Sequence, residues 1–351
     1  MPQTMPSNHR KNLLALAIGI MFWPINSMAL DLAEAPPGSV EPYVRPNVII
    51  SIDDSGSMNY RLDVENASGA SNRTTPDLTG GGWSPNSRRM NVLKYALKGI
   101  FDPADPNYDS SLLPDKKIRL AWQAMNANNG TPGDLNTSVN SMKILQGAHR
   151  TNFLSFITKL TPNSSTPSHK MFQQADAYMR LPLSANGPWA NDPGAGVGAP
   201  YLGCRRNYHI FMTDGRWNGA VSGGSQDDNT KNIKIPFGDP SGTVFGSTVA
   251  ASRPNTQLYS DTYSNTLADW AFYSWANPLR SDLAGKPEPA TDYRKAPASE
   301  NFGKDVSNND AVLDRFWNPR YDPADWPHMV TYTIGFSAMA YTWPGFSSPT
   351  N

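Results

Sequence analysis

Cysteine is almost missing from this sequence, because Cys204 is the only one among its 351 residues. A single thiol cannot form a disulfide within the chain, so the fold must be stabilised by packing or by bound metal. We interpret Cys204 as a small buried residue near a strand rather than as a reactive thiol. Pairing with a cysteine of another chain is the alternative.

An excess of charge of either sign is also missing. Lys and Arg together number 30, and Asp and Glu together number 30, so the formal net charge is zero. No long basic run occurs, which excludes the electrostatic signature of a protein that binds nucleic acid. The sequence also lacks a P-loop and a G-x-G-x-x-G motif, so we expect no nucleotide ligand.

The common catalytic motifs are absent as well. No histidine lies in an H-E-x-x-H motif, and no G-x-S-x-G turn is present. We expect His209 and His328 to be core residues, because one lies inside an apolar stretch and the other just before one. The sequence therefore predicts that the chain is not an enzyme. Its five histidines are His9, His149, His169, His209 and His328.

No apolar run is long enough for a comfortable membrane span, which needs about 20 residues. The apolar stretch 13–23 follows the basic residues 9–11 and precedes the small-x-small site 27–29, an order typical of a secretory signal. We predict a signal peptide over residues 1–29 with cleavage after Ala29, and therefore export. An uncleaved membrane anchor is the alternative. Residues 30–46 contain four prolines and are predicted to form an extended linker.

The most informative stretch is the β-branched run Val48–Ile52, followed by Asp53, Ser55 and Ser57. An apolar run of this kind predicts a strand that is covered on both faces. The D-x-S-x-S spacing lets one carboxylate and two hydroxyls converge from a tight turn. Such hard oxygen ligands favour Mg²⁺, with Mn²⁺ and Ca²⁺ as alternatives. We interpret the adjacent Asp54 as facing solvent or tuning the field at the metal.

Strand patterns and helix patterns alternate along the rest of the chain. This alternation predicts one α/β domain over residues 47–345, with a doubly wound, mainly parallel sheet and helices on both faces. Loop insertions are expected at about 59–87, 181–203 and 216–262. Thr266 and Asp269 have the spacing of a helix capping box. The expected strands are 48–52, 118–125, 208–212 and 329–336, and the expected helices are 88–101, 153–160, 169–179, 267–275 and 311–317.

Two further oxygen-bearing side chains lie in turns of this predicted sheet. Asp214 directly follows the strand 208–212 and Thr213, and Thr166 lies in the turn before the helix 169–179. Ligands of open α/β sheets bind beyond the carboxyl ends of the strands. We therefore expect Asp214 and Thr166 to lie near Asp53 and its serines.

These three turns together resemble the von Willebrand factor A domain, a Rossmann-like fold, and in particular its metal-ion-dependent adhesion site. The resemblance rests on Ile52–Met58, on Ser165–Pro167 and on Met212–Gly215. It implies a cofactor metal ion, with Mg²⁺ expected, and a protein partner that supplies a carboxylate to this metal. The implied metal ligands are Asp53, Ser55, Ser57, Thr166 and Asp214.

A narrower resemblance is to the PilY/PilC family of type IV pilus tip and biogenesis proteins. It rests on the segments 87–101, 204–215, 267–270 and 326–335, which include Cys204-Arg205-Arg206-Asn207-Tyr208 and Trp326-Pro327-His328-Met329. The resemblance implies a pilus assembly or adhesion module whose candidate partners are minor pilins or a host surface protein. Family members continue into a calcium-binding C-terminal β-propeller, which we expect to be absent because the sequence ends at Asn351.

Other functions are compatible with the same residues. One alternative is a secreted von Willebrand factor A-domain protein that is unrelated to pili. Another is a non-functional N-terminal fragment of a longer pilus protein. A subunit of a metal-inserting ATPase complex is a third, and the predicted export signal argues against it.

Overall fold

The computed structural model describes residues 44–62, 88–215, 217–218, 233–234, 244–245, 265–304, 310–316, 318 and 320–336. The predicted signal peptide and nearly all of the predicted linker lie outside the described residues, as do most of the insertions at 59–87 and 216–262. No helix among the described residues has the length and apolar character needed to cross a membrane.

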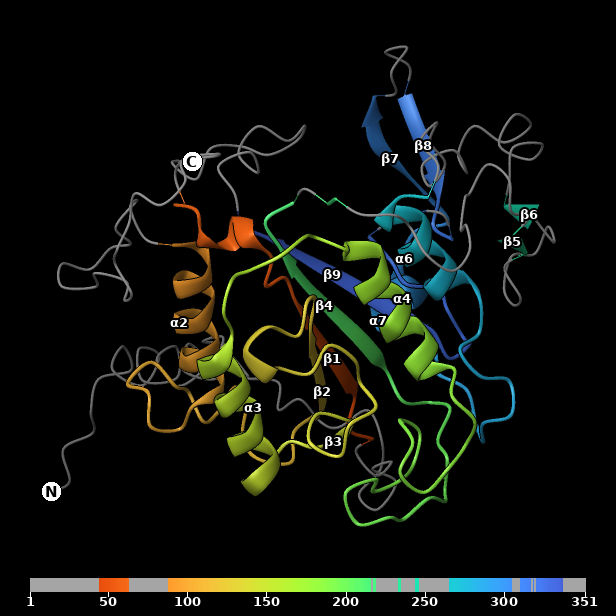
Figure 1. The fold of residues 1–351 in the computed structure, drawn as a ribbon. Coiled ribbons are helices and arrows are strands. Elements are labelled where there is room, and N and C mark those ends of the chain that lie inside the picture. The colour runs from red at the N-terminus through yellow and green to blue at the C-terminus, as the bar shows by residue number, and fades with distance from the viewer. Residues whose placement is uncertain are drawn as a thin grey trace, which may run out of the picture. The chain divides into compact units, whose positions relative to one another are not determined.

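A five-stranded sheet forms the centre of the structure, in the order β3-β2-β1-β4-β9 (Figure 1). Strand β1 (Asn47–Ile52) lies in the middle and pairs in parallel with β2 (Arg119–Ala124) and with β4 (Asn207–Thr213). Strand β9 (Met329–Gly335) pairs in parallel with β4. The two-residue β3 (Lys143–Ile144) pairs antiparallel with β2. The predicted α/β fold with a mainly parallel sheet is thus confirmed.

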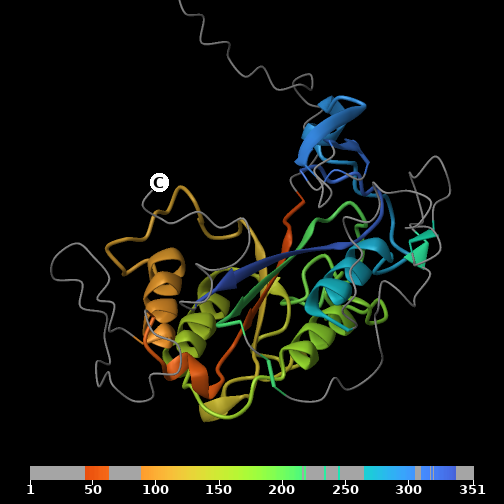
Figure 2. The same cartoon turned by 90° about the horizontal axis from the view of Figure 1, so that it is seen from above.

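Helices cover both faces of the sheet, as predicted. Figure 2 shows α2 (Arg89–Phe101) and α3 (Gly147–Lys159) on one side, and α4 (Ser168–Met179) and α6 (Leu267–Ala276) on the other. Alternate side chains of β1 serve the two faces, because Ile50 packs in the core with α2 and α3 whereas Ile49 packs with α4 and α6. Each such fully buried side chain contributes about 1.5–3 kcal/mol through the hydrophobic effect.

The helix ends follow local sequence signals. At the start of α6, the Thr266 hydroxyl accepts a hydrogen bond from the Asp269 backbone N–H at 3.1 Å. In return, the Asp269 carboxylate accepts one from the Thr266 N–H at 2.6 Å. The predicted capping box is therefore confirmed, and it satisfies backbone donors that the first turn of a helix leaves without partners.

Helix α2 follows the predicted pattern except at Ile100. Leu93, Leu97 and Phe101 are buried, but the side chain of Ile100 is 52% exposed. In the last turn of α2, Phe101 takes the inward position and packs edge-on against Phe153 of α3, with ring centroids 4.8 Å apart. The prediction that Ile100 faces the core is wrong because this position lies at the margin of the apolar face.

Two other predictions from the sequence are wrong. The helix predicted at 311–317 is not found, because residues 310–314 form a strand instead. This strand, β8 (Asp310–Asp314), pairs antiparallel with β7 (Ser299–Lys304). A short apolar run does not distinguish helix from strand by periodicity, and here pairing with a distant segment decides. Cys204 is only partly buried, since it lies in the loop before β4 rather than in the core.

Several short elements had no clear sequence signal. They lie in connections and consist of two to five residues each, which is below the length at which periodicity is informative. They are η1 (Gly56–Asn59), η2 (Asn128–Gly130), β5 (Ile233–Lys234), β6 (Val244–Phe245) and α7 (Thr291–Lys295).

The capping box predicts a measurable stability effect. Replacing Thr266→Ala removes the hydroxyl acceptor at the start of α6 and should lower the free energy of unfolding by about 1 kcal/mol. Thr158→Ala is the matched control, because the exposed Thr158 hydroxyl bonds only to the Leu154 carbonyl within α3. Urea denaturation followed by circular dichroism measures both changes. Equal effects of the two substitutions would contradict the capping role.

Candidate metal centre

The carboxyl ends of β1 and β4 bring two aspartates to one edge of the sheet. Asp53 directly follows β1, and Asp214 directly follows β4. The Asp53 N–H donates to the Met212 carbonyl at 2.8 Å, so the backbone pairing of β1 with β4 extends to this point. The Thr213 hydroxyl donates to Asp53 Oδ2 at 2.7 Å. The sheet register therefore fixes the position of the Asp53 carboxylate.

The turn after β1 brings the two serine hydroxyls together. The Ser55 N–H donates to Asp53 Oδ1 at 2.8 Å, which folds the chain back over the carboxylate. The short helix η1 then continues the turn, and Ser55 Oγ and Ser57 Oγ lie 3.0 Å apart. The predicted convergence of one carboxylate and two hydroxyls from a single turn is thus seen in the structure.

Thr166 reaches this region through a loop rather than through a strand. The Gly56 N–H donates to the Ser164 carbonyl at 3.0 Å, which ties the serine turn to the loop that carries Thr166. Thr166 is buried, and its N–H donates to Asn218 Oδ1 at 2.7 Å. Among the hydrogen bonds of the described residues, none joins the Thr166 hydroxyl to Asp53, the serines or Asp214. The Gly56–Ser164 hydrogen bond thus ties the Thr166 loop to the serine turn, although the Thr166 hydroxyl makes no hydrogen bond to the other predicted ligands.

Asp54 does not face solvent, so that part of the prediction is wrong. Its side chain is fully buried, and its two oxygens accept from the backbone N–H groups of Asn126 at 2.7 Å and Asn128 at 3.1 Å. The Asp54 carbonyl also accepts from the Asn163 N–H at 2.8 Å. Through these hydrogen bonds, Asp54 connects the loops after β2 and α3 to the end of β1. These partners are far away in sequence, so no local pattern indicated them.

Burial dominates the electrostatics of the two adjacent aspartates. Burial, and next the nearby Asp214 carboxylate, raise the pKa of Asp53 to about 6, although the hydrogen bonds from Ser55 and Thr213 act in the opposite direction. Burial also raises the pKa of Asp54, against the hydrogen bonds from the loop after β2. The negative charge at Asp53 is therefore only partly compensated by the protein.

Arg89 is a member of this site that sequence reasoning missed. As the first residue of α2, it donates from Nη1 to Asp214 Oδ2 at 3.0 Å, and both side chains are almost completely buried. Its Nε donates to the Arg61 carbonyl at 3.1 Å. A basic residue at the first position of a helix opposes the helix dipole, and this unusual position was the available sequence signal.

The donor set fits a hard divalent cation. Two carboxylates and two hydroxyls gather here without sulfur or imidazole, which suits Mg²⁺ or Mn²⁺ better than a soft metal. No three His, Cys, Asp or Glu side chains form a metal-binding cluster among the described residues, so such a site depends on its hydroxyls. The raised pKa of Asp53 marks a negative charge that a cation would compensate. The role of these residues as metal ligands stays a prediction.

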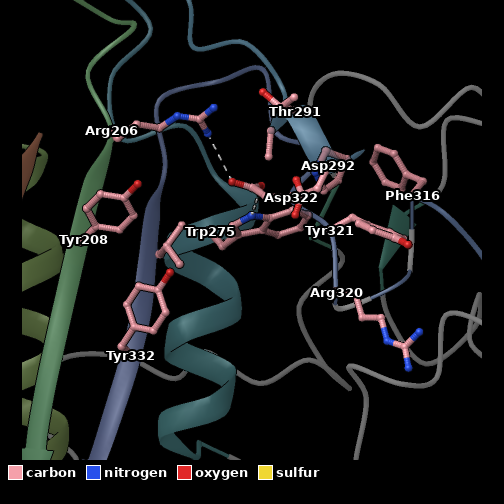
Figure 3. Close-up of a pocket in the computed structure, with 13 residues that line it drawn as sticks. Arg206, Tyr208, Trp275, Thr291, Asp292, Phe316, Arg320, Tyr321, Asp322 and Tyr332 are labelled. Atoms are coloured by element: carbon pink, nitrogen blue, oxygen red, sulfur yellow. Dashed lines mark hydrogen bonds and ion pairs between the residues drawn. The ribbon is translucent and has the colours of Figure 1, made fainter. Parts of the chain in front are cut away.

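A separate cavity of about 590 Å³ lies along the first halves of β4 and β9 (Figure 3). None of the five predicted ligands lines it. Asp322 lies within it and is held by Trp275 Nε1 at 3.2 Å and by His328 Nε2 at 3.1 Å. Arg206 lies 3.5 Å from the same carboxylate. His328 is thus buried with hydrogen-bonded nitrogens, as predicted, and these polar groups connect β4, α6 and the segment before β9.

Comparison with known proteins finds relatives for most of the chain. The chain is 32% identical over 244 residues to the type IV pilus biogenesis factor PilY1 of Pseudomonas aeruginosa strain PAK, a match that spans 69% of the chain and 18% of the relative. The PilY1 of strain PAO1 is also 32% identical, over 247 residues, which is 69% of the chain and 19% of that protein. The PilY1 of strain UCBPP-PA14 is 28% identical over 239 residues, or 68% of the chain and 17% of that protein.

These relatives support the PilY/PilC pilus protein family for this chain. The matched region is less than one fifth of the length of each relative. No protein-family model and no solved structure matches the chain. The resemblance to a von Willebrand factor A domain therefore still rests on the motifs and on the geometry of the site.

The raised pKa of Asp53 predicts how the stability of the metal-free protein depends on pH. The pKa of Asp53 is about 6 in the folded state, above the 3.8 of an ordinary Asp carboxyl, so the folded state binds the proton more tightly. Proton binding by Asp53 therefore stabilises the folded state fully below about pH 4, and this stabilisation is lost as the pH rises through about 6. The free energy of unfolding should fall by about 3 kcal/mol in total over this range. Denaturation in chelator across this range measures the loss.

Asp53→Asn is the matched variant for this prediction. An asparagine keeps the shape of the side chain but does not titrate, so the part of the pH dependence that belongs to Asp53 should disappear. Asp54 still titrates in this variant, and the difference between the two proteins isolates Asp53. Identical pH profiles for wild type and variant would contradict the prediction.

Proposed function

We propose that this chain is an exported module of type IV pilus biogenesis that binds a protein partner through a metal ion. The observation that carries the proposal is the convergence of Asp53, Ser55 and Ser57 with Asp214 at the carboxyl edge of the sheet. Ligand binding at this edge is the general rule for open α/β sheets. The pattern resembles a metal-ion-dependent adhesion site.

The pilus part of the proposal rests on the relatives. They are named type IV pilus biogenesis factors, and the similarity covers about two thirds of the chain. Export rests on the predicted signal peptide at residues 1–29. Minor pilins are the first candidate partners, and a host surface protein is the second.

A binding role explains the site better than a catalytic role. No histidine among the described residues hydrogen-bonds to Asp53, Ser55, Ser57 or Asp214, so the serines have no general base of this kind. A bound divalent cation would supply positive charge and coordination positions that accept an external carboxylate. Asp53, Ser55, Ser57 and Asp214 would hold this cation, with Thr166 close by.

The serine hydroxyls provide the first test. The double variant Ser55→Ala/Ser57→Ala should keep the fold, since the sheet core does not use these hydroxyls, but should lose stabilisation by Mg²⁺. A ligand at 100 times its dissociation constant stabilises the folded state by about 2.7 kcal/mol. Thermal unfolding with Mg²⁺ and with chelator measures this difference. Ser165→Ala, an exposed serine of the neighbouring loop, is the control that should respond as wild type does.

Partner binding provides the second test. Purified minor pilins should bind the immobilised wild-type protein in Mg²⁺ and dissociate when chelator is added, because the metal bridges the two proteins. The double serine variant should bind weakly under both conditions, and Ser165→Ala should bind as wild type does. Binding that persists unchanged in chelator would exclude a metal bridge. Surface plasmon resonance gives the dissociation rates directly.

A further inference from the structure

The ion pair between Arg89 and Asp214 is the feature of the site that the proposed function leaves unexplained. It joins the first residue of α2 to the residue after β4, and its two side chains are 1% and 2% exposed. Taking a guanidinium and a carboxylate out of water costs free energy for each ion, and their mutual attraction offsets this cost only in part. Such a pair is weak evidence for stability, so stability alone does not explain why it is present.

Arg89 has its own fixed place in the structure. Its Nε donates to the Arg61 carbonyl at 3.1 Å, its backbone N–H donates to the Tyr60 carbonyl at 3.0 Å, and its guanidinium lies 5.7 Å from the centre of the Tyr60 ring. Tyr60 directly follows the short helix η1 that carries Ser57. Arg89 thus connects the serine turn, the start of α2 and Asp214.

Arg89 changes the net charge of the site, both without metal and with a divalent cation bound. Among the candidate ligands, Asp53 and Asp214 bring two negative charges, and Arg89 reduces this sum to one. The buried Asp54 carboxylate is left out of the sum, because its two oxygens already accept from the backbone N–H groups of Asn126 and Asn128. With a divalent cation bound, the sum without Arg89 would be zero, whereas with Arg89 it is one positive charge. A site that keeps positive charge after metal binding attracts an external carboxylate, and it binds the metal itself less tightly.

We propose that Arg89 sets the metal affinity of this site. Its guanidinium pairs with the Asp214 carboxylate, and this pairing weakens the binding of a divalent cation. The same positive charge makes the metal-loaded site attract an acidic ligand. This inference rests on the proposed metal-binding function and deepens it. It assigns to Arg89 a role in tuning and positioning, since the residue acts through Asp214.

The test compares Arg89→Gln with wild type by calorimetric titration with Mg²⁺ and Mn²⁺ and by thermal unfolding. Loss of the guanidinium leaves Asp214 without its counter-charge, so the metal-free variant should unfold at a lower temperature than wild type. Its affinity for Mg²⁺ should rise by about tenfold or more. Its stabilisation by Mg²⁺ should be larger than that of wild type.

Two further variants separate charge from packing. Arg89→Lys keeps the positive charge and should retain an Mg²⁺ affinity close to that of wild type. Arg150→Gln is the matched control, because Arg150 is also a buried arginine on a carboxylate, pairing with Asp115 at 2.9 Å and bonding to the Phe101 carbonyl at the far end of α2. It should lower stability without changing the affinity for Mg²⁺.

An acidic probe tests the second half of the proposal. Acetate should bind to the Mn²⁺-loaded wild-type protein and displace metal-bound water, which is measured by water-proton relaxation. The Mn²⁺-loaded Arg89→Gln protein should bind acetate several-fold more weakly, since its site carries no residual positive charge. Equal acetate binding by the two proteins would contradict the inference.

The outcomes separate this inference from the proposed function. If Mg²⁺ stabilises neither wild type nor any variant, the metal site itself is wrong. If Mg²⁺ stabilises wild type but Arg89→Gln binds it with unchanged affinity, only the role of Arg89 is wrong. Failure of Arg89→Gln to fold even in excess Mg²⁺ would show that the ion pair is structural, and would also overturn the inference.

Discussion

The burial of Asp53 at the end of the central strand is the constraint on which the rest of the site depends. Strand β1 is covered on both faces, so the side chains that follow it remain inside the protein. Asp53 and Asp54 then turn to different neighbours, as successive side chains of extended backbone do. The Asp53 carboxylate accepts hydrogen bonds from Thr213 and the serine turn, whereas the Asp54 carboxylate accepts them from the loop after β2. One aspartate is therefore available for a ligand, and the other holds the loops around it.

The protein compensates these buried charges unequally, and this inequality defines the site. Asp54 receives two backbone N–H groups, and Asp214 receives the guanidinium of Arg89. Asp53 has two hydrogen-bond donors of its own, but the Asp214 carboxylate lies near enough to raise its pKa further. A buried charge without full compensation costs free energy unless a counter-ion arrives. The shortage of positive charge at Asp53 is thus the physical reason to expect a cation at this edge.

Local sequence signals were sufficient for the four parallel strands of the sheet, the main helices and the capping box, because periodicity and turn residues are properties of neighbouring residues. They did not indicate the two-residue edge strand β3. They also located Asp53, Ser55, Ser57 and Asp214, since each follows a recognisable strand. They failed for Asp54 and Arg89, whose partners lie 74 and 125 residues away. They failed for β8 as well, since its strand conformation depends on pairing with β7. In these three cases the structure depends on contacts between residues that are far apart in the sequence, which local patterns do not show.

Long loop insertions are compatible with a fixed arrangement of the residues in the site. Asp53 and Asp214 are each adjacent to a strand of the central sheet, and Arg89 is the first residue of α2, so the lengths of the loops beyond them do not move their backbone. Lengthening a flexible loop costs little free energy, about 0.6 kcal/mol per doubling. Thr166 is the exception, because its loop is fixed by the hydrogen bond from Gly56 to Ser164 and by Asn218. A change in loop length should therefore affect Thr166 before it affects the two aspartates, which makes the aspartates and the serine turn the invariant part of the geometry.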